Sequence, residues 1–171
     1  MVAAFPSRED VLRILDRVTD PEIPVISVRE LGVLRDVQVD GDPDKPGQTR
    51  VRVTITPTYS GCPAMDVMRQ DIEKELHDAG IANVEVMQVL SPAWTTDWIT
   101  DEGKAKLLAY GIAPPEKTAD IRALKGEAPI VACPQCGSKK TVMVSAFGST
   151  ACKALWKCTD CLEPFDQFKC L

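Results

Sequence analysis

The cysteines are the residues of this chain whose type and spacing could do chemistry. There are seven of them in 171 residues, and six lie in the last quarter of the chain. Four form two CxxC pairs that are separated by 21 residues, Cys133-x-x-Cys136 and Cys158-x-x-Cys161. Each pair places two thiolates on one tight turn, and two such turns complete a tetrahedral site for a single soft metal ion. The spacing therefore predicts a structural zinc ribbon with these four cysteines as its ligands.

A metal ion would also explain how so short a segment folds. A stretch of about 40 residues buries too little apolar surface to be stable alone, so metal binding would supply its folding free energy. Cys152 and Cys170 are expected to be spare thiols near the ribbon, and a second metal site or ligation of an iron–sulfur cluster stays open as the alternative. A redox dithiol at Cys133 and Cys136 is disfavoured because a second pair is available to complete the site.

The seventh cysteine, Cys62, stands alone in an unusual loop that runs from Thr56 to Pro63. If Pro63 is the first helical residue, Cys62 lies at the helix N-cap, where unpaired N–H groups and the helix dipole lower the pKa of a thiol. The hydroxyls of Thr58 and Ser60 could hydrogen-bond an anion beside it. The alternative is that Cys62 is a small buried apolar residue, because free cysteine is among the most buried residue types.

Catalytic partners for Cys62 are missing from its sequence neighbourhood. His77 is the only histidine, and it lies about four turns further along the same predicted helix, where we expect it on the surface. Asp20 and Glu22 flank a proline. At this spacing the two carboxylates are more typical of a brace for a loop than of an acid–base pair.

Hydrophobic periodicity predicts a small α+β domain over residues 1–112. A first helix is expected to be capped by Ser7. Two more helices are expected to run from Pro63 to Ala79 and from Asp101 to Tyr110, with strands over 33–39, 51–55 and 84–90. A turn-rich loop at 41–47 joins the first two strands, and a helix joins the second to the third, which predicts a mixed three-stranded sheet. Trp94 and Trp98 follow the third strand, either as a lid over the core or as a contact for a partner.

Charge and composition divide the chain at the same place. Residues 131–171 carry five Lys and three acidic residues, whereas the rest of the chain carries 15 basic and 22 acidic residues. The stretch 113–130 is rich in proline and charge and is expected to link the first domain to the ribbon at 131–171. The net charge of −5 disfavours general affinity for nucleic acid or for membranes, and no stretch is apolar over the length of a bilayer. No secretory signal is visible, so the expected location is the cytoplasm.

Several motifs resemble the family of the D component of bacterial phenylacetyl-CoA epoxidase, over nearly the whole chain. They are Asp20-Pro21-Glu22-Ile23-Pro24, Leu31-Gly32, Thr56 to Pro63, Pro92 to Trp98, Phe147 to Leu155 and Pro164 to Cys170. The first domain also resembles the MIP18 family of metal–sulfur cluster assembly proteins, in which an Asp-Pro-Glu motif and a Cys-Pro at a helix start recur. These resemblances imply an MIP18-like α+β fold followed by a β zinc ribbon.

The resemblance also implies a function. Such complexes are multicomponent di-iron monooxygenases that epoxidise phenylacetyl-CoA in aerobic phenylacetate degradation, with an iron–sulfur flavin reductase as a further subunit. The chain would be an accessory or maturation subunit that handles iron or an iron–sulfur cluster through Cys62, with Asp20 and Glu22 shaping the pocket and Thr58 and Ser60 beside it. Its expected partners are the oxygenase core and the reductase, and its expected cofactors are structural zinc and transient iron or an iron–sulfur cluster.

The chain itself is neither of the two catalytic components that the resemblance describes. A single histidine excludes a di-iron site built from paired Glu-x-x-His ligands, and no GxGxxG motif is present. Two other functions stay open. Cys62 could be the nucleophile or redox thiol of an enzyme, although no base lies near it in the sequence, and the ribbon could bind nucleic acid, which the acidic first domain disfavours.

Overall fold

The computed structural model describes residues 6–41, 49–115 and 130–169. The chain forms two compact units, residues 1–94 and 95–171. Most of the predicted loop at 41–47 and most of the predicted linker at 113–130 lie outside the described residues. Cys170 lies outside them as well. No helix in the described ranges is long and apolar enough to cross a membrane.

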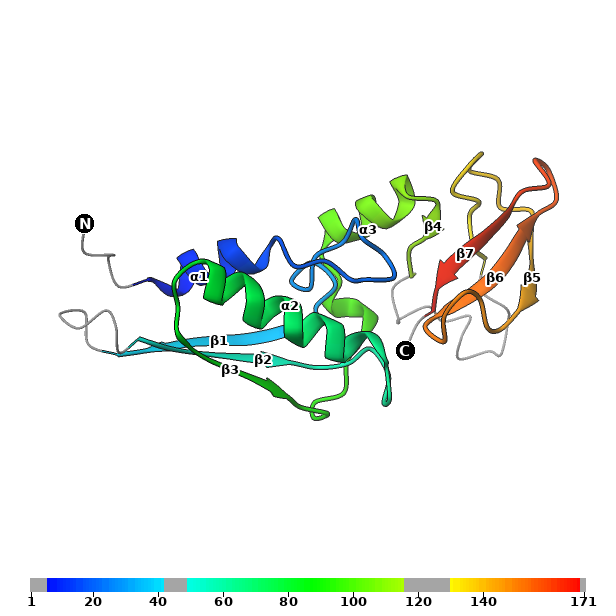
Figure 1. Cartoon of the computed structure of the whole chain (residues 1–171). Helices are drawn as coiled ribbons and strands as arrows, with labels where there is room; N and C mark the ends of the chain where they lie inside the picture. Colours follow the sequence, from blue (N-terminus) through cyan, green and yellow to red (C-terminus); the bar gives the residue numbers. More distant parts are fainter. Residues whose placement is uncertain (1–5, 42–48, 116–129, 170–171) are drawn as a thin grey trace. The chain divides into compact units, whose positions relative to one another are not determined.

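The first unit is a three-stranded sheet with two helices (Figure 1). Its elements are α1 (Arg8–Leu15), β1 (Leu34–Asp40), β2 (Arg50–Ile55), α2 (Ala64–Asp78) and β3 (Asn83–Gln88). The strand order is β1-β2-β3, with β1 antiparallel and β3 parallel to β2. Parallel neighbours require a crossover connection, which α2 provides. The mixed three-stranded sheet expected from the sequence is therefore confirmed.

The register of the strands gives this sheet one apolar face. Val53 on β2 pairs with Val37 on β1 and with Val86 on β3, so valines from all three strands lie on the same face. The helices α1 and α2 cover that face (Figure 1). The preceding residue of β2, Arg52, points to the opposite face, where its Nε lies 3.1 Å from Glu85 Oε2. The alternation predicted over residues 51–55 thus separates the core from a polar surface.

The first helix begins where the sequence predicts. Ser7 Oγ accepts a hydrogen bond from Asp10 N at 3.1 Å, and the Asp10 carboxylate accepts one from Ser7 N at 2.9 Å. This reciprocal capping box satisfies two backbone donors that would otherwise lack partners. The predicted apolar face is buried at Val11, Leu15 and Val18.

The second helix differs from the prediction at both ends by one residue. It begins at Ala64 rather than Pro63 and ends at Asp78, so Ala79 is exposed instead of buried. His77 is exposed, as expected. The rest of the predicted stripe is buried at Met65, Met68, Ile72 and Leu76.

Trp94, the last residue of the first unit, is a lid over its core. The indole is 4% exposed, and its Nε1 donates a hydrogen bond to Leu31 O at 3.0 Å. A buried indole N–H needs such an acceptor. For Trp94 the structure thus supports the core lid rather than a partner contact.

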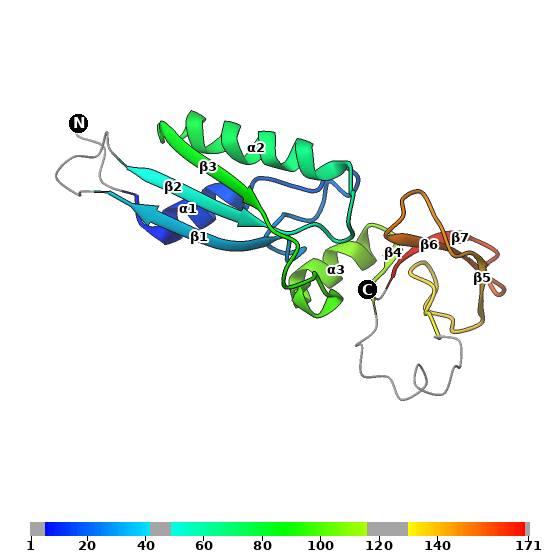
Figure 2. The ribbon, with the colours of Figure 1, turned by 90° about the horizontal axis from the view of Figure 1, so that it is seen from below.

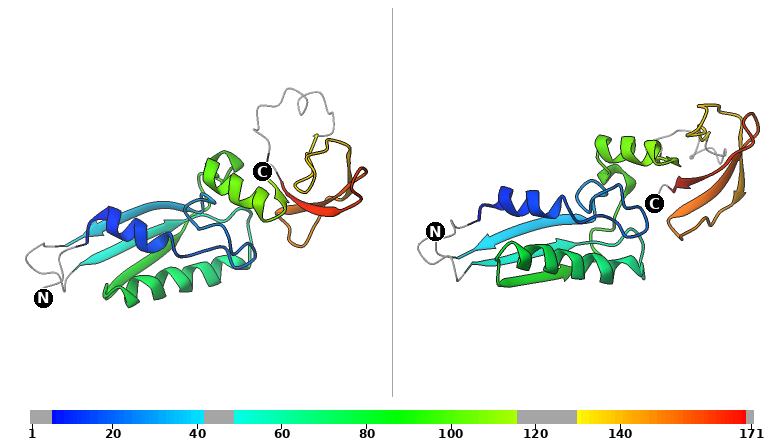
Figure 3. Two further views of the ribbon diagram at one scale, coloured as in Figure 1. Left: turned by 90° about the horizontal axis from the view of Figure 1, so that it is seen from above. Right: turned by 45° about the horizontal axis from the view of Figure 1, so that its top comes forward.

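The second unit contains two short helices and a four-stranded sheet (Figure 3). Its elements are η2 (Thr96–Trp98), α3 (Asp101–Ala109), β4 (Ile112–Ala113), β5 (Thr141–Ser145), β6 (Lys153–Cys158) and β7 (Pro164–Phe168). The order is β4-β7-β6-β5, in which β5, β6 and β7 form an antiparallel ribbon and β4 is parallel to β7. The predicted β ribbon is therefore present.

The strand β4 was not expected from the sequence, because two residues are too few to show a periodic pattern. Its pairing places the end of the predicted first domain in the same compact unit as the ribbon. The helix α3, which begins at the predicted residue and ends one residue earlier than Tyr110, belongs to this unit as well. The domain limits 1–112, 113–130 and 131–171 remain predictions.

Candidate functional site

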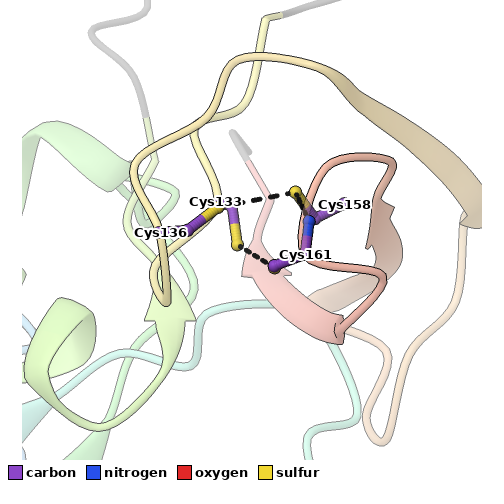
Figure 4. A group of neighbouring side chains, drawn as sticks. All are labelled: Cys133, Cys136, Cys158 and Cys161. Carbon is purple, nitrogen blue, oxygen red and sulfur yellow. Dashed lines mark hydrogen bonds between the residues drawn. The ribbon is translucent and has the colours of Figure 1, made fainter.

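Four cysteine side chains converge between two turns of the ribbon (Figure 4). Cys133 and Cys136 lie on the turn that precedes β5, whereas Cys158 is the last residue of β6 and Cys161 lies on the turn that leads to β7. All four Sγ atoms lie within 4.8 Å of one another. The Sγ atoms of Cys133 and Cys161 are 3.7 Å apart, as are those of Cys136 and Cys158. The structure thus brings together the four residues that the CxxC spacing predicts as ligands.

These separations fit a single tetrahedral metal ion. Four sulfur atoms at the usual zinc–sulfur distance of about 2.3 Å lie about 3.8 Å apart along the edges of a tetrahedron. A disulfide would bring two sulfurs to about 2.05 Å, and all four cysteines are free thiols. A cluster of several iron atoms would hold the sulfurs further apart than one ion does. The donor set therefore suits one soft ion, with every coordination position taken by protein.

The backbone of the two turns is folded in the same way. Cys133 N donates to Ser138 O at 2.9 Å, and Cys158 N donates to Glu163 O at 3.0 Å, so the same bond closes each turn. Cys161 N also points at Cys158 Sγ, at 3.5 Å. N–H groups directed at this sulfur, first that of Cys161, lower the pKa of Cys158 to about 7. At Cys161 the N–H of Glu163 acts in the same direction, but burial and the neighbouring cysteines outweigh it and raise the pKa of this thiol to about 12. Within the second turn it is therefore Cys158 that is set to be a thiolate.

The residue that follows the second cysteine of each turn has a positive φ. Gly137 has a φ of +73° and Leu162 a φ of +68°. Glycine adopts this conformation freely, whereas it costs a residue with a side chain about 1–2 kcal/mol. The equivalence of the two positions was missed from the sequence, because a leucine stands where the turn geometry favours glycine.

Asp160 joins the second turn to the residues that follow the first. Its carboxylate accepts hydrogen bonds from Ser138 Oγ at 2.6 Å and from Lys140 Nζ at 3.3 Å. These two donors, Ser138 first, lower the pKa of Asp160. Thr159 N adds a bond to Lys140 O at 2.8 Å. The two halves of the metal site are therefore tied together by contacts that do not involve the cysteines.

Cys152 lies apart from this cluster. It is buried, and its Sγ is 3.0 Å from Thr150 Oγ1. Within the described ranges, no group of three or more possible metal ligands includes it. Because Cys170 lies outside those ranges, the role of these two cysteines as spare thiols stays a prediction.

Cys62 lies in the first unit, in the loop between β2 and α2. Because Pro63 is the N-cap and Ala64 the first helical residue, Cys62 precedes the cap instead of occupying it. Its backbone N donates to Tyr59 O at 3.3 Å, and its O accepts from Met65 N at 3.3 Å. The thiol is half-buried. The N-cap position predicted for Cys62 is therefore wrong by one residue.

The surroundings of Cys62 raise the pKa of its thiol, which is the opposite of the prediction. Burial is the largest cause, and the negative charges of Glu22 and Asp20 act in the same direction. Hydrogen bonds from Ala64 N and from the Tyr59 side chain lower the pKa, but by less in total. The prediction of a lowered pKa failed because burial and two nearby acids outweigh the helix start. Carboxylates that disfavour a thiolate favour a cation at the same place.

Asp20 braces the loop that carries it, as the sequence suggested. The carboxylate is buried, and its Oδ1 accepts hydrogen bonds from Glu22 N at 2.7 Å and from Ile23 N at 2.9 Å. Asp20 N donates to Ile26 O at 3.0 Å. The same bonds fix the position of the negative charge that acts on Cys62.

The segment that follows α1 lies beside the loop that leads into α2, at one end of the sheet (Figure 2). The first segment carries Asp20 and Glu22, and the second carries Cys62 together with the predicted hydroxyls. Thr58 is half-buried and Ser60 exposed, and neither side chain has a hydrogen-bond partner among the residues that the structure describes. Tyr59 is a site residue that the sequence did not reveal, since only the turn brings its side chain to the thiol.

Both parts of the chain match known families. Residues 8–89 match the family described as iron–sulfur cluster assembly protein. Residues 117–169 match the family described as PaaD zinc beta ribbon domain. The two matches separate the Cys62 loop from the four-cysteine site in the same way as the structure does.

Two curated relatives differ in how much of the chain they share. A protein of Escherichia coli (strain K12), named as the putative D component of 1,2-phenylacetyl-CoA epoxidase, is 42% identical, over 98% of this chain and 96% of its own length. The "Fe-S protein maturation auxiliary factor" of Porphyromonas gingivalis (strain ATCC BAA-308 / W83) is 33% identical, over 59% of this chain and 90% of its own. The first relative therefore shares both parts, and the second is a shorter protein.

Two solved structures match the chain over a similar fraction. The domain of unknown function DUF59 from Bacillus anthracis has 25% identity and a TM-score of 0.51, over 58% of this chain and 90% of its own. A conserved hypothetical protein from Thermotoga maritima has 30% identity and a TM-score of 0.50, over 62% of this chain and 98% of its own. Both support the mixed α+β fold.

Proposed function

The chain belongs to the family of the D component of 1,2-phenylacetyl-CoA epoxidase, and from this premise we propose that it assists the loading of iron or an iron–sulfur cluster into the other subunits through Cys62. The proposed recipients are the iron–sulfur flavin reductase and the di-iron oxygenase core. The match of residues 8–89 to iron–sulfur cluster assembly proteins supports this role. So do two relatives that are named Fe-S protein maturation auxiliary factors.

The observation that carries the proposal is the convergence of Cys62 with Asp20 and Glu22 at one end of the first sheet. The two carboxylates act on the thiol through their charge. Iron would bind Cys62 as a thiolate and release its proton to solvent, and the negative charges nearby would favour the cation. Handover would exchange the Cys62 thiolate for a ligand of the recipient, a cysteine thiolate in the reductase or a carboxylate or histidine in the di-iron core, without gain or loss of electrons.

The same surroundings disfavour Cys62 as a catalytic nucleophile. A nucleophilic cysteine needs a lowered pKa or an adjacent base. The pKa of Cys62 is raised. His77 is the single histidine of the chain and lies near the far end of α2, on an exposed surface. A binding role for the thiol therefore accounts better for its setting than catalysis does.

We propose that the four-cysteine site holds a structural zinc ion. The match to a zinc ribbon family and the sulfur separations near 3.7 Å support zinc as a single tetrahedral ion. When bound, zinc would supply folding free energy and no catalysis, because four cysteines leave no open position. The ribbon would then be a rigid module that docks onto partner subunits. Nucleic acid is a poorer partner, since residues 131–171 contain no arginine and the chain has a net charge of −5.

Complementation of cells that lack the native gene tests the role of Cys62. Wild type and a Cys152→Ala control should restore growth on phenylacetate and the iron and sulfide content of the reductase, whereas Cys62→Ser should not. All three proteins should accumulate to the same level with one zinc per chain, which shows that the ribbon is folded, and equal circular dichroism should show that the first unit is folded as well. Normal growth and normal iron content with Cys62→Ser would refute the proposed function.

A further inference from the structure

The outer strand of the ribbon carries an exposed apolar surface. In the order β4-β7-β6-β5 the strand β5 is last, so one of its edges pairs with no strand within the described part of the chain. Val142, Met143 and Val144 are 50%, 48% and 58% exposed, and Phe147, two residues beyond the strand, is 69% exposed. These four residues are called the β5 patch below.

Such an edge is usually protected in a soluble protein. A row of unpaired N–H and C=O groups flanked by apolar side chains can pair with another chain, and charges, prolines or bulges normally prevent this. Here the register with β6 shifts between Met143 and Ser145, which leaves Val144 in a bulge and limits regular pairing to the first part of β5. The strand carries no charge and no proline. The register with β6 puts Met143 beside the buried Trp156 and Val142 beside the exposed Lys157, so the edge strand is apolar on both of its faces. Single exposed apolar residues are ordinary, but four of them along one edge strand indicate an interaction site.

Phe147 is held in place although it is exposed. Phe147 N donates to Ser145 Oγ at 3.1 Å, and Lys169 Nζ lies 4.5 Å from the centre of the phenyl ring. Lys169 Nζ also donates to Ala146 O at 3.1 Å. These contacts restrain the backbone at Phe147 and place a cation on its ring, which reduces the entropy lost when a partner binds.

Lysines surround the first part of β5. Lys139 and Lys140 precede the strand, and Lys157 on β6 lies opposite Val142. Lys140 pairs with Asp160 at 3.3 Å. Lys139 and Lys157 are exposed, and neither has an ion-pair partner among residues 6–41, 49–115 and 130–169. The rim of the patch is therefore positively charged, whereas the chain as a whole carries −5.

We propose that the β5 patch docks an extended segment of another epoxidase subunit in which a run of apolar residues is flanked by acidic residues. The segment would add a strand beside Thr141 to Met143, with its apolar side chains on the β5 patch and its acids on Lys139 and Lys157. A second copy of this chain is a poorer occupant, since an isologous contact would bring the same lysine rim onto itself. This inference deepens the docking role proposed for the ribbon and rests on it.

Binding of the zinc-loaded full-length protein to separately purified epoxidase subunits tests the inference. Val144→Lys should weaken binding at least about tenfold, because it places an unpaired charge in the contact. Leu108→Lys is the matched control, since Leu108 lies on α3 and is 47% exposed, and it should change the affinity by less than about twofold. If Val144→Lys fails to retain zinc, Met143→Lys replaces it. Hydrogen exchange at residues 141–143 should become slower in the complex.

The possible results separate this inference from the proposed function. Wild-type affinity in Val144→Lys, or no binding by the wild type, overturns the docking site. The wild type could instead form concentration-dependent dimers that Val144→Lys abolishes, and bind no other subunit. This result would assign the β5 patch to a second copy of the chain and would also overturn the inference. None of these results bears on the loading role, which the Cys62→Ser complementation tests separately.

Discussion

Replacing Leu162 with glycine should stabilise the metal-loaded ribbon, even though leucine is the larger and more apolar residue. Leu162 has a φ of +68°, which costs a residue with a side chain about 1–2 kcal/mol. Glycine removes this cost but adds conformational freedom to the unfolded chain, worth about 0.4–1 kcal/mol. The leucine side chain is 64% exposed, so little burial is lost. The net expected stabilisation is about 0.5–1 kcal/mol.

The equivalent position of the first turn provides a reciprocal test. Gly137 has a φ of +73°, and a Cβ added to it would meet no atom within 4 Å. The cost of Gly137→Ala is therefore backbone strain alone, reduced by the lower entropy of the unfolded chain. It should destabilise the ribbon by about 0.5–1 kcal/mol.

Zinc affinity is the assay for both variants, because folding of so small a ribbon is coupled to metal binding. Competition with a chromophoric chelator at fixed pH should show affinity raised about two- to fivefold in Leu162→Gly and lowered by a similar factor in Gly137→Ala. Urea unfolding of the metal-loaded proteins should give the same order. Equal affinity for both variants and the wild type, or weaker binding by Leu162→Gly, would refute the geometry described for the two turns.

Further predictions follow from the thiols and from the core of the first unit. The rate of Cys62 alkylation should rise with pH, and the midpoint of this rise should lie above that of a free cysteine. Glu22→Gln should lower the midpoint. A midpoint equal to that of a free cysteine in the wild type would contradict the surroundings described for Cys62. Because the folded-state pKa is the raised one, this thiol contributes stability below the unfolded-state pKa that is lost as the pH rises through the folded-state value. Metal analysis should find one zinc per chain in the wild type and in Cys152→Ala, and none in Cys136→Ser. An excess of chelator should remove the zinc from the wild type. Trp94→Phe should cost about 1–3 kcal/mol in urea unfolding because it leaves a buried carbonyl without its donor, and a change below about 0.5 kcal/mol would argue against the lid.

Local signals in the sequence were enough to predict most elements. Ser7 and Asp10 predict the start of α1, and the alternation over 51–55 predicts β2. A helix between two strands predicts that β2 and β3 are parallel. The CxxC spacing was sufficient for the metal site, because two turns that each hold two thiolates have few other ways to satisfy them. These features depend on neighbours in the sequence, so periodicity and spacing reveal them.

Features that depend on tertiary contacts were not predictable in the same way. The pKa of Cys62 depends on burial and on Asp20 and Glu22, which are distant in the sequence, and helix position alone predicted the wrong direction. Leu162 conceals the equivalence of the two turns, because its positive φ has no signature in its residue type. The strand β4 exists only through its pairing with β7.

Transfer of an iron–sulfur cluster in vitro tests the central claim most directly. The zinc-loaded protein, reconstituted with iron and sulfide, would be incubated with the apo form of the reductase, and the cluster of the re-isolated reductase measured by its visible absorption. The account predicts that the wild type loads the reductase, whereas Cys62→Ser, with its zinc intact, does not. Equal loading by Cys62→Ser would contradict the account.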